Sequence, residues 1–157
     1  VKTEIENFDV SALNMSFLLA KNILLFWDKT APANPKETDS MAEVSSSVAQ
    51  SLLKNGYEFA IGWNSKNRIE TAQIKTEDDL LEAIPRMIKF GAEKAEEDFY
   101  ESFEHFGKII CIAKEPPKEL FERTGASLII CDKTAAGSGI IPFGDKTYTE
   151  DLEFLEL

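Results

Sequence analysis

Ile23-Leu24-Leu25-Phe26-Trp27-Asp28 is the stretch that decides the fold, because an unbroken apolar run ends there on a carboxylate. A continuous apolar run is typical of a strand buried on both faces of a parallel sheet, so we expect a buried strand over 22–27. A polar, proline-rich loop and an amphipathic stretch follow. Ligands of open α/β sheets bind beyond the carboxyl ends of the strands, which makes Asp28 the first candidate for a site residue.

The amphipathic stretch from Ser40 to Asn55 predicts a helix. Ser40 and Glu43 fit a capping box, in which a hydroxyl and a carboxylate bind the free N–H groups of the first turn. Gly56 is expected to end the helix. Four apolar side chains recur at helical spacing and predict its buried face: Met41, Val44, Val48 and Leu52.

Two strands are expected next, over Tyr57–Trp63 and Ile69–Ile74. The short connection between them cannot form a parallel crossover, so the two strands should be antiparallel. Thr76 and Asp79 predict the cap of a second helix, which Pro85 should kink or end. The predicted core face of this helix is apolar throughout: Leu80, Leu81, Ile84, Met87 and Ile88.

Helices and strands continue to alternate in the second half of the chain. The expected order is a helix over 92–106, a strand over Lys108–Ala113, a short helix between Pro116 and Gly125, and strands over Ala126–Cys131 and Ile140–Phe143. Such alternation predicts an α/β fold of three layers, with a doubly wound, mostly parallel sheet and one antiparallel edge strand. We expect a lead-in segment over 1–20 and a single domain over 21–157.

Composition narrows the classes of partner. The 157 residues suit one domain, and a net charge of −11 argues against binding to nucleic acid or to anionic membranes. No apolar run approaches the roughly 20 residues of a membrane span, and no signal peptide is visible. We therefore expect a cytoplasmic segment. The first residue is Val1 rather than Met, which predicts that the chain is an excerpt or a processed product and leaves open a membrane anchor elsewhere in the parent protein.

Three segments carry a resemblance to a known family: Asn22-Ile-Leu-Leu-Phe-Trp-Asp28, Met41-Ala-Glu-Val-Ser-Ser-Ser-Val-Ala-Gln-Ser-Leu-Leu53 and Gly56-Tyr-Glu-Phe-Ala-Ile-Gly62. With this element order, the chain resembles the von Willebrand factor A domain over about 20–135. More narrowly, it resembles the bacterial family of unknown function number 58. The resemblance implies a site for a divalent cation such as Mg²⁺, bound by an Asp-x-Ser-x-Ser motif, a Thr from a second loop and often a further Asp.

Carried over residue by residue, this cation site is degraded. Asp28 matches the motif's Asp and Thr30 replaces its first Ser, but Pro32 stands at the second Ser and offers no side-chain oxygen. Thr76 is the candidate for the second-loop Thr. Lys114 stands where the family pattern has an Asp, so its ammonium can pair with Asp28 near the cation position, or extend freely into solvent.

Two functions follow as alternatives. The resemblance implies a non-catalytic interaction or scaffold module, with a MoxR-type AAA+ ATPase as the partner and with binding residues at Asp28, Thr30, Thr76, Lys114 and Asp132. The alternative is a small Mg²⁺-dependent hydrolase or phosphatase using Asp28, Asp132 and Glu115, which needs carboxylates converging on one open metal position. We favour the non-catalytic reading, with no cofactor.

Two smaller features have structural interpretations. Cys111 and Cys131 lie within apolar runs, which predicts two buried thiols in neighbouring strands rather than a disulfide or a zinc site. The triplet Asp-Lys-Thr occurs at 28–30, 132–134 and 145–147 without a fixed spacing. Two copies follow predicted strands, as the residue preferences of turns alone would select.

Overall fold

The computed structural model of the chain describes residues 22–31, 33–65, 68–89, 103, 106–116, 126–135, 137 and 140–144. Within these residues the protein has an α/β fold, as predicted. The elements in chain order are β1 (Ile23–Asp28), α1 (Pro35–Lys54), β2 (Phe59–Ser65), β3 (Arg68–Ile74), α2 (Glu77–Lys89), β4 (Lys108–Ala113), β5 (Ser127–Ile130) and β6 (Ile140–Pro142).

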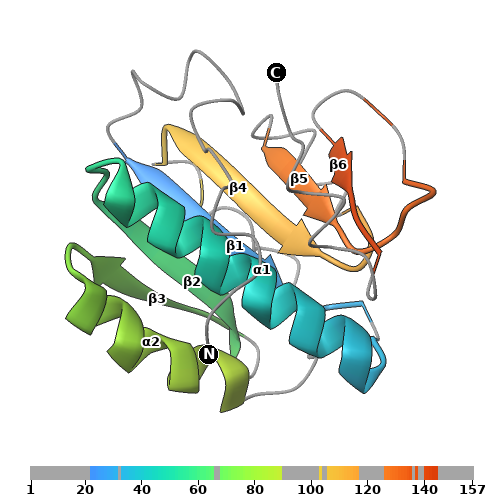
Figure 1. Cartoon of the computed structure of the whole chain (residues 1–157), viewed down its shortest axis with the longest axis horizontal. Helices are drawn as coiled ribbons and strands as arrows, with labels where there is room; N and C mark the ends of the chain where they lie inside the picture. The colour runs from blue at the N-terminus through green and yellow to red at the C-terminus, as the bar shows by residue number, and fades with distance from the viewer. Residues whose placement is uncertain are drawn as a thin grey trace.

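The six strands form one sheet in the order β3-β2-β1-β4-β5-β6 (Figure 1). All neighbouring pairs are parallel except β2 and β3, which pair antiparallel from Phe59↔Ile74 to Ser65↔Arg68. The predicted mostly parallel sheet with one antiparallel edge strand is therefore confirmed. Both described helices lie in front of the sheet in Figure 1, where α1 packs on β1 and β4 and α2 packs on β2 and β3.

The continuous apolar run is explained by the central position of β1, whose six residues are all buried. Because side chains alternate along a strand, Ile23, Leu25 and Trp27 point into the core under α1 and α2. Leu24 and Phe26 point into a second core on the opposite face of the sheet. On that face the ring of Phe103 packs edge-on against Phe26, with 4.8 Å between the centroids.

The start of α1 differs from the prediction. The helix begins at Pro35, and the capping box is formed by Asn34 and Glu37 rather than by Ser40 and Glu43. Asn34 Oδ1 accepts from the N–H of Glu37 over 2.8 Å, and Glu37 Oε1 accepts from the N–H of Asn34 over 3.1 Å. Proline suits the first helical position because that position needs no N–H, so Pro35 starts the helix instead of delaying it.

The predicted core face and end of α1 are confirmed. Met41, Val44, Val48 and Leu52 are buried, and Gly56 follows the helix in the left-handed conformation, with φ of +82°. In α2, the cap by Thr76 and Asp79 is also confirmed, because Thr76 Oγ1 accepts from the N–H of Asp79 and Asp79 Oδ2 accepts from that of Thr76. The end of α1 and the start of α2, on either side of the hairpin of β2 and β3, therefore both lie where the sequence predicts them.

Two expectations for α2 need correction. Pro85 is predicted to kink or end the helix, and of these two effects the end does not occur, because the helix continues to Lys89. Leu80 and Met87 are buried as predicted, but Leu81 and Ile88 are exposed by 67% and 51%. The buried face of α2 is narrower than its apolar face, because Leu80, Ala83 and Met87 are buried, Ile84 is partly buried against the same core, and Leu81 and Ile88 are exposed.

Some predictions lie outside the described residues. These are the lead-in over 1–20, the short helix before Gly125 and most of the helix over 92–106, so the third layer stays a prediction. The two thiols are confirmed as free and buried. None of the helices in the described ranges is long and apolar enough to cross a membrane.

Candidate functional site at the carboxyl edge of the sheet

The sheet changes its winding direction between β1 and β4. From β1 the chain adds β2 and β3 on one side, and from β4 it adds β5 and β6 on the other. The carboxyl ends of strands at such a switch point are where open α/β sheets bind ligands. We call the polar side chains gathered at this edge the carboxyl-edge cluster: Asp28, Thr30, Glu37, Asn64, Lys114 and Asp132.

Asp28 and Thr30 form a closed turn at the end of β1. Asp28 Oδ1 accepts from the N–H of Thr30 over 2.8 Å and also from the Thr30 hydroxyl. Asp28 is 5% exposed, so its carboxylate is committed to contacts within the protein rather than to solvent. The structure thus brings together the two motif residues that the sequence singled out.

Asn64 joins this turn to the neighbouring strand. It lies near the end of β2 and is buried. Its side-chain oxygen accepts from the backbone N–H of Lys29 over 2.8 Å, and its amide nitrogen lies 3.4 Å from Thr30 Oγ1 as donor. The sequence analysis missed Asn64. A polar residue directly after the apolar run of β2 was the available signal, since parallel strands end at one edge.

Lys29 is the second residue that the sequence analysis missed. Its side chain points to the α2 face, where the ammonium donates to the carbonyl oxygen of Met87 and lies 4.3 Å from the centre of the Trp27 ring. Met87 is in the last turn of α2, whose carbonyl groups have no partner within the helix and attract positive charge. Burial lowers the pKa of Lys29 from 10.5 to about 8.

Lys114 takes a different partner from the one expected. Its ammonium forms an ion pair with Glu37 in the first turn of α1, and it donates to the carbonyl oxygen of Cys131 over 3.2 Å. The hydrogen bond with Glu37 raises the pKa of Lys114, and the same bond lowers the pKa of Glu37. Neither alternative for Lys114, a pair with Asp28 or a side chain free in solvent, is therefore found: Lys114 links the end of β4 to α1 and β5.

Asp132 repeats the geometry of Asp28. Asp132 Oδ1 accepts from the N–H of Thr134 over 2.9 Å and from its hydroxyl over 2.7 Å. Both bonds lower the pKa of the exposed Asp132, and the bond from the backbone N–H of Thr134 has the larger effect. Two copies of Asp-Lys-Thr thus form the same turn after β1 and β5, as turn chemistry predicts. The copy at 145–147 lies outside the described residues.

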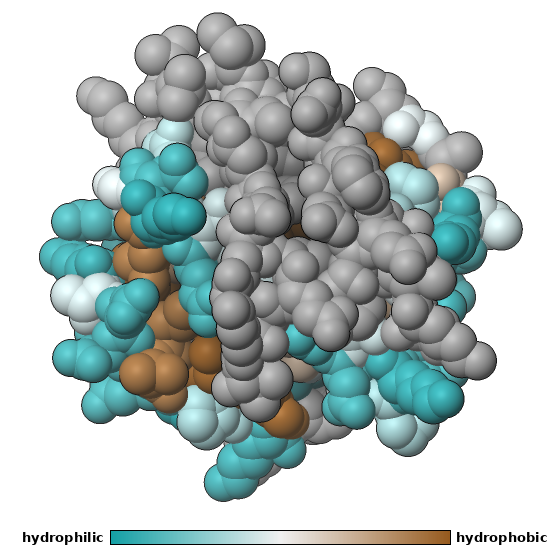
Figure 2. All heavy atoms as spheres, viewed as in Figure 1, coloured by the Kyte–Doolittle hydropathy of each residue, from teal (hydrophilic) through white to brown (hydrophobic). Residues whose placement is uncertain are grey.

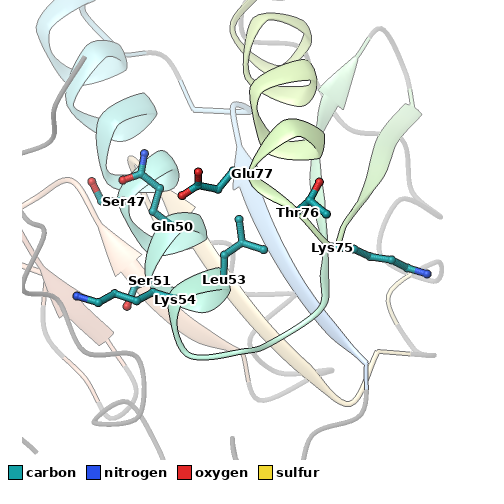
Figure 3. Close-up of a pocket in the computed structure, with 8 residues that line it drawn as sticks. All are labelled: Ser47, Gln50, Ser51, Leu53, Lys54, Lys75, Thr76 and Glu77. Atoms are coloured by element: carbon teal, nitrogen blue, oxygen red, sulfur yellow. The ribbon is translucent and has the colours of Figure 1, made fainter.

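Thr76 lies at the other edge of the sheet. Because β3 is antiparallel to β2, its last residue pairs with the first residue of β2, and Thr76 follows that end. There it borders a pocket of about 510 Å³ between α1 and α2. Figure 3 shows the carboxylate of Glu77 directed toward Gln50 in this pocket, while Lys54 and Lys75 extend away from it. Thr76 is therefore not part of the carboxyl-edge cluster.

The contacts of the described side chains differ from those of the Mg²⁺ site that the resemblance implies. One oxygen of Asp28 already accepts two hydrogen bonds from Thr30, and Thr76 lies at the opposite edge. Lys114 adds a positive charge at the switch point. Within the described ranges, no three acidic, histidine or cysteine side chains gather as metal ligands would. Pro32 lies outside these ranges.

The fold and the cluster together define an open, Rossmann-like α/β domain with a polar switch-point edge. Comparison with known proteins gives no matching family model and no match among the curated proteins.

Proposed function

We propose that this chain is a non-catalytic protein-interaction module of the von Willebrand factor A type. In this proposal, its metal-ion-dependent adhesion site has been replaced by direct contacts between side chains. The observation that carries the proposal is the occupied carboxyl edge. Thr30 donates twice to Asp28, while Lys114 pairs with Glu37 beside it. Because Asp28 and Lys114 already bind groups of this chain, the edge is less suited to holding a cation, which favours a non-catalytic module.

The strand order supports the A-type assignment. An antiparallel edge strand follows β2, and Asp28 ends the central strand at the switch point, as the resemblance predicts. The partner that this resemblance implies is a MoxR-type AAA+ ATPase. The module would help this ATPase to assemble with a further protein or to act on it. An acidic module of charge −11 would favour a partner with a basic docking surface.

The partner assignment is tested with a purified MoxR-type ATPase from the same organism, by surface plasmon resonance. We expect saturable binding that Thr30→Val weakens several-fold, because it removes the hydroxyl that holds Asp28 in its turn. Thr76→Val is the matched control at the opposite edge and should leave binding unchanged. Equal effects of the two substitutions, or no binding by the wild-type chain, would reject this partner site.

The degraded-site assignment is tested separately, by titrating Mg²⁺ and Mn²⁺ in calorimetry. We expect no saturable binding at the carboxyl edge, because Asp28 Oδ1 already accepts two hydrogen bonds from Thr30 and Thr76 lies at the opposite edge. Saturable binding that Asp28→Ala abolishes and Thr76→Val retains would show that a working cation site remains.

The alternative, a Mg²⁺-dependent hydrolase, has weaker support from the positions of its residues. Asp28 is the last residue of β1 and Asp132 follows β5, with β4 between these strands, and each carboxylate binds its own threonine. Glu115 is exposed after β4. Hydrolysis of p-nitrophenyl phosphate with added Mg²⁺ that is lost in both Asp28→Asn and Asp132→Asn would favour the enzyme over the interaction module.

A further inference from the structure

Helix α2 carries an apolar stripe that is exposed at both of its ends. Leu81 and Ile88 are 67% and 51% exposed, and they are the large apolar side chains exposed to this extent in the described ranges. Ile84 and Pro85 lie between them in the sequence. Residues at positions i, i+3, i+4 and i+7 share one side of a helix, so these four form a continuous stripe.

The stripe lines one wall of a groove between α1 and α2 with a volume of about 450 Å³. Ala42 and Ser46 of α1 lie on the facing wall, and Trp27 of β1 also borders the groove. Figure 2 shows hydrophobic residues gathered on this side of the molecule, over α1 and α2. Grooves of this kind bind the apolar face of an amphipathic helix through side chains at one-turn spacing.

The charged side chains that line the groove indicate which kind of partner helix it would bind. Two charged side chains line the groove, Asp39 and Glu43 of α1, and both are acidic. The whole chain has a net charge of −11, so a second copy would bring like charges together at this groove. A partner with lysine or arginine beside its apolar face would instead meet opposite charges.

We propose that the groove between α1 and α2 binds a basic amphipathic helix of a partner protein. Leu81, Ile84 and Ile88 contact the apolar face of that helix, while Asp39 and Glu43 contact its basic flank. This surface shares no residue with the carboxyl-edge cluster, so the inference goes beyond the proposed function and does not depend on it.

Trp27 supplies a built-in reporter. It is 2% exposed, and its indole N–H is buried without a hydrogen-bond acceptor among the described residues. A helix that settles on the groove changes the packing around this ring, so the emission of Trp27 should change on binding. Trp27→Phe removes this signal and leaves Trp63, on the next strand, as the background.

The test uses the full chain and a synthetic helical peptide of leucine and lysine with an apolar face on one side. Calorimetry and tryptophan emission should report saturable binding with one site per chain. Leu81→Gln and Ile88→Gln should each weaken it at least about fivefold, since a central apolar contact is worth over 1 kcal/mol. Leu81→Met should retain it. Both positions are exposed, so the thermal unfolding of these variants should match that of the wild type.

The charge part of the proposal has its own matched pair. Glu43→Gln, in the groove, should weaken peptide binding about two- to threefold, whereas Glu82→Gln, exposed on α2 outside the groove, should not. Equal affinity for a peptide with glutamate in place of lysine would overturn the proposal. Peptide binding that Leu81→Gln leaves unchanged would also overturn the proposal, because it would reflect general attraction to an acidic protein. Concentration-dependent self-association that Leu81→Gln abolishes would overturn it too, because it would assign the groove to a second copy of this chain.

Discussion

Asn64 Oδ1 accepts a hydrogen bond from the backbone N–H of Lys29 over 2.8 Å, which ties the end of β2 to the residue that follows β1. Both residues are buried, so no solvent replaces this bond if it is lost. The turn that holds Asp28 therefore depends on a side chain from the neighbouring strand. The carboxyl-edge cluster is built by the sheet as a whole and not by the Asp28 loop alone.

The first prediction concerns this bond. Asn64→Leu has a similar size but leaves the N–H of Lys29 buried without its acceptor, which costs about 1–3 kcal/mol in free energy of unfolding. Urea unfolding measures this loss. Gln73→Leu, exposed on the edge strand β3, is the control and should change stability by less than about 0.5 kcal/mol. Equal losses in the two variants would contradict a special role for Asn64.

The second prediction concerns Lys29 and pH. Its pKa is about 8 in the folded protein and 10.5 ordinarily, so between these values the unfolded state holds more protons. Lys29 therefore makes the free energy of unfolding rise with pH across this window, and below pH 8 the full cost of burying its charge is present. Lys29→Met should lose this dependence, and unfolding curves recorded from below pH 8 to above pH 10.5 would show it.

Lys114→Met is the matched control for that experiment. The hydrogen bond with Glu37 raises the pKa of Lys114, so its stabilising effect is present below pH 10.5 and is lost above it. The two variants should therefore depart from the wild type with opposite trends in pH. If the free energies of unfolding of both variants changed with pH in the same way as that of the wild type, neither lysine would be coupled to folding as described.

A third prediction concerns the pair of Glu37 and Lys114, whose side chains are 13% and 27% exposed. A double-mutant cycle with Glu37→Gln and Lys114→Met should give a coupling of about 1 kcal/mol. Gln keeps the capping box, so the cycle isolates the charge. The pKa of Glu37 is lowered from 4.5, so the coupling should be present above pH 4.5 and disappear as the pH falls further. Additive effects at neutral pH would rule out the pair.

The fourth prediction separates backbone strain from side-chain space. Gly56 has φ of +82°, and no atom lies within 4 Å of the position of an added Cβ. Gly56→Ala should therefore cost about 1 kcal/mol from the left-handed backbone alone. At Gly107 the nearest atom to an added Cβ is 3.7 Å away and the backbone is ordinary, so Gly107→Ala should be nearly neutral. Thermal unfolding of the two variants compares them directly.

The sheet was predictable because its signals are local. The unbroken apolar run of β1 indicates burial on both faces, and the short connection before β3 permits only an antiparallel pair. The start of α1 was misjudged because Ser40 and Glu43 satisfy the same pattern as Asn34 and Glu37. A capping pattern does not specify which copy starts the helix, and Pro35 at the first helical position settles it here.

The candidate site was only half predictable, because its contacts join residues distant in sequence. Asp28 and Thr30 belong to one turn, and the motif found both. The ion pair between Lys114 and Glu37 depends on where α1 begins, so the error in the helix start carried over to the partner of Lys114. Thr76 was misplaced because the direction of β3 sends its carboxyl end to the opposite edge.

The two identical Asp-Lys-Thr turns have a consequence for how this edge would meet a partner. They end β1 and β5, the strands on either side of β4, and so stand roughly 10 Å apart, two strand spacings, with Lys114 between them. Each turn fixes its carboxylate and hydroxyl before any encounter. Asp28 is buried and Asp132 is exposed, so a partner would meet the second turn directly and the first only through the groups around it. A partner that binds the second turn would lose little entropy in ordering it.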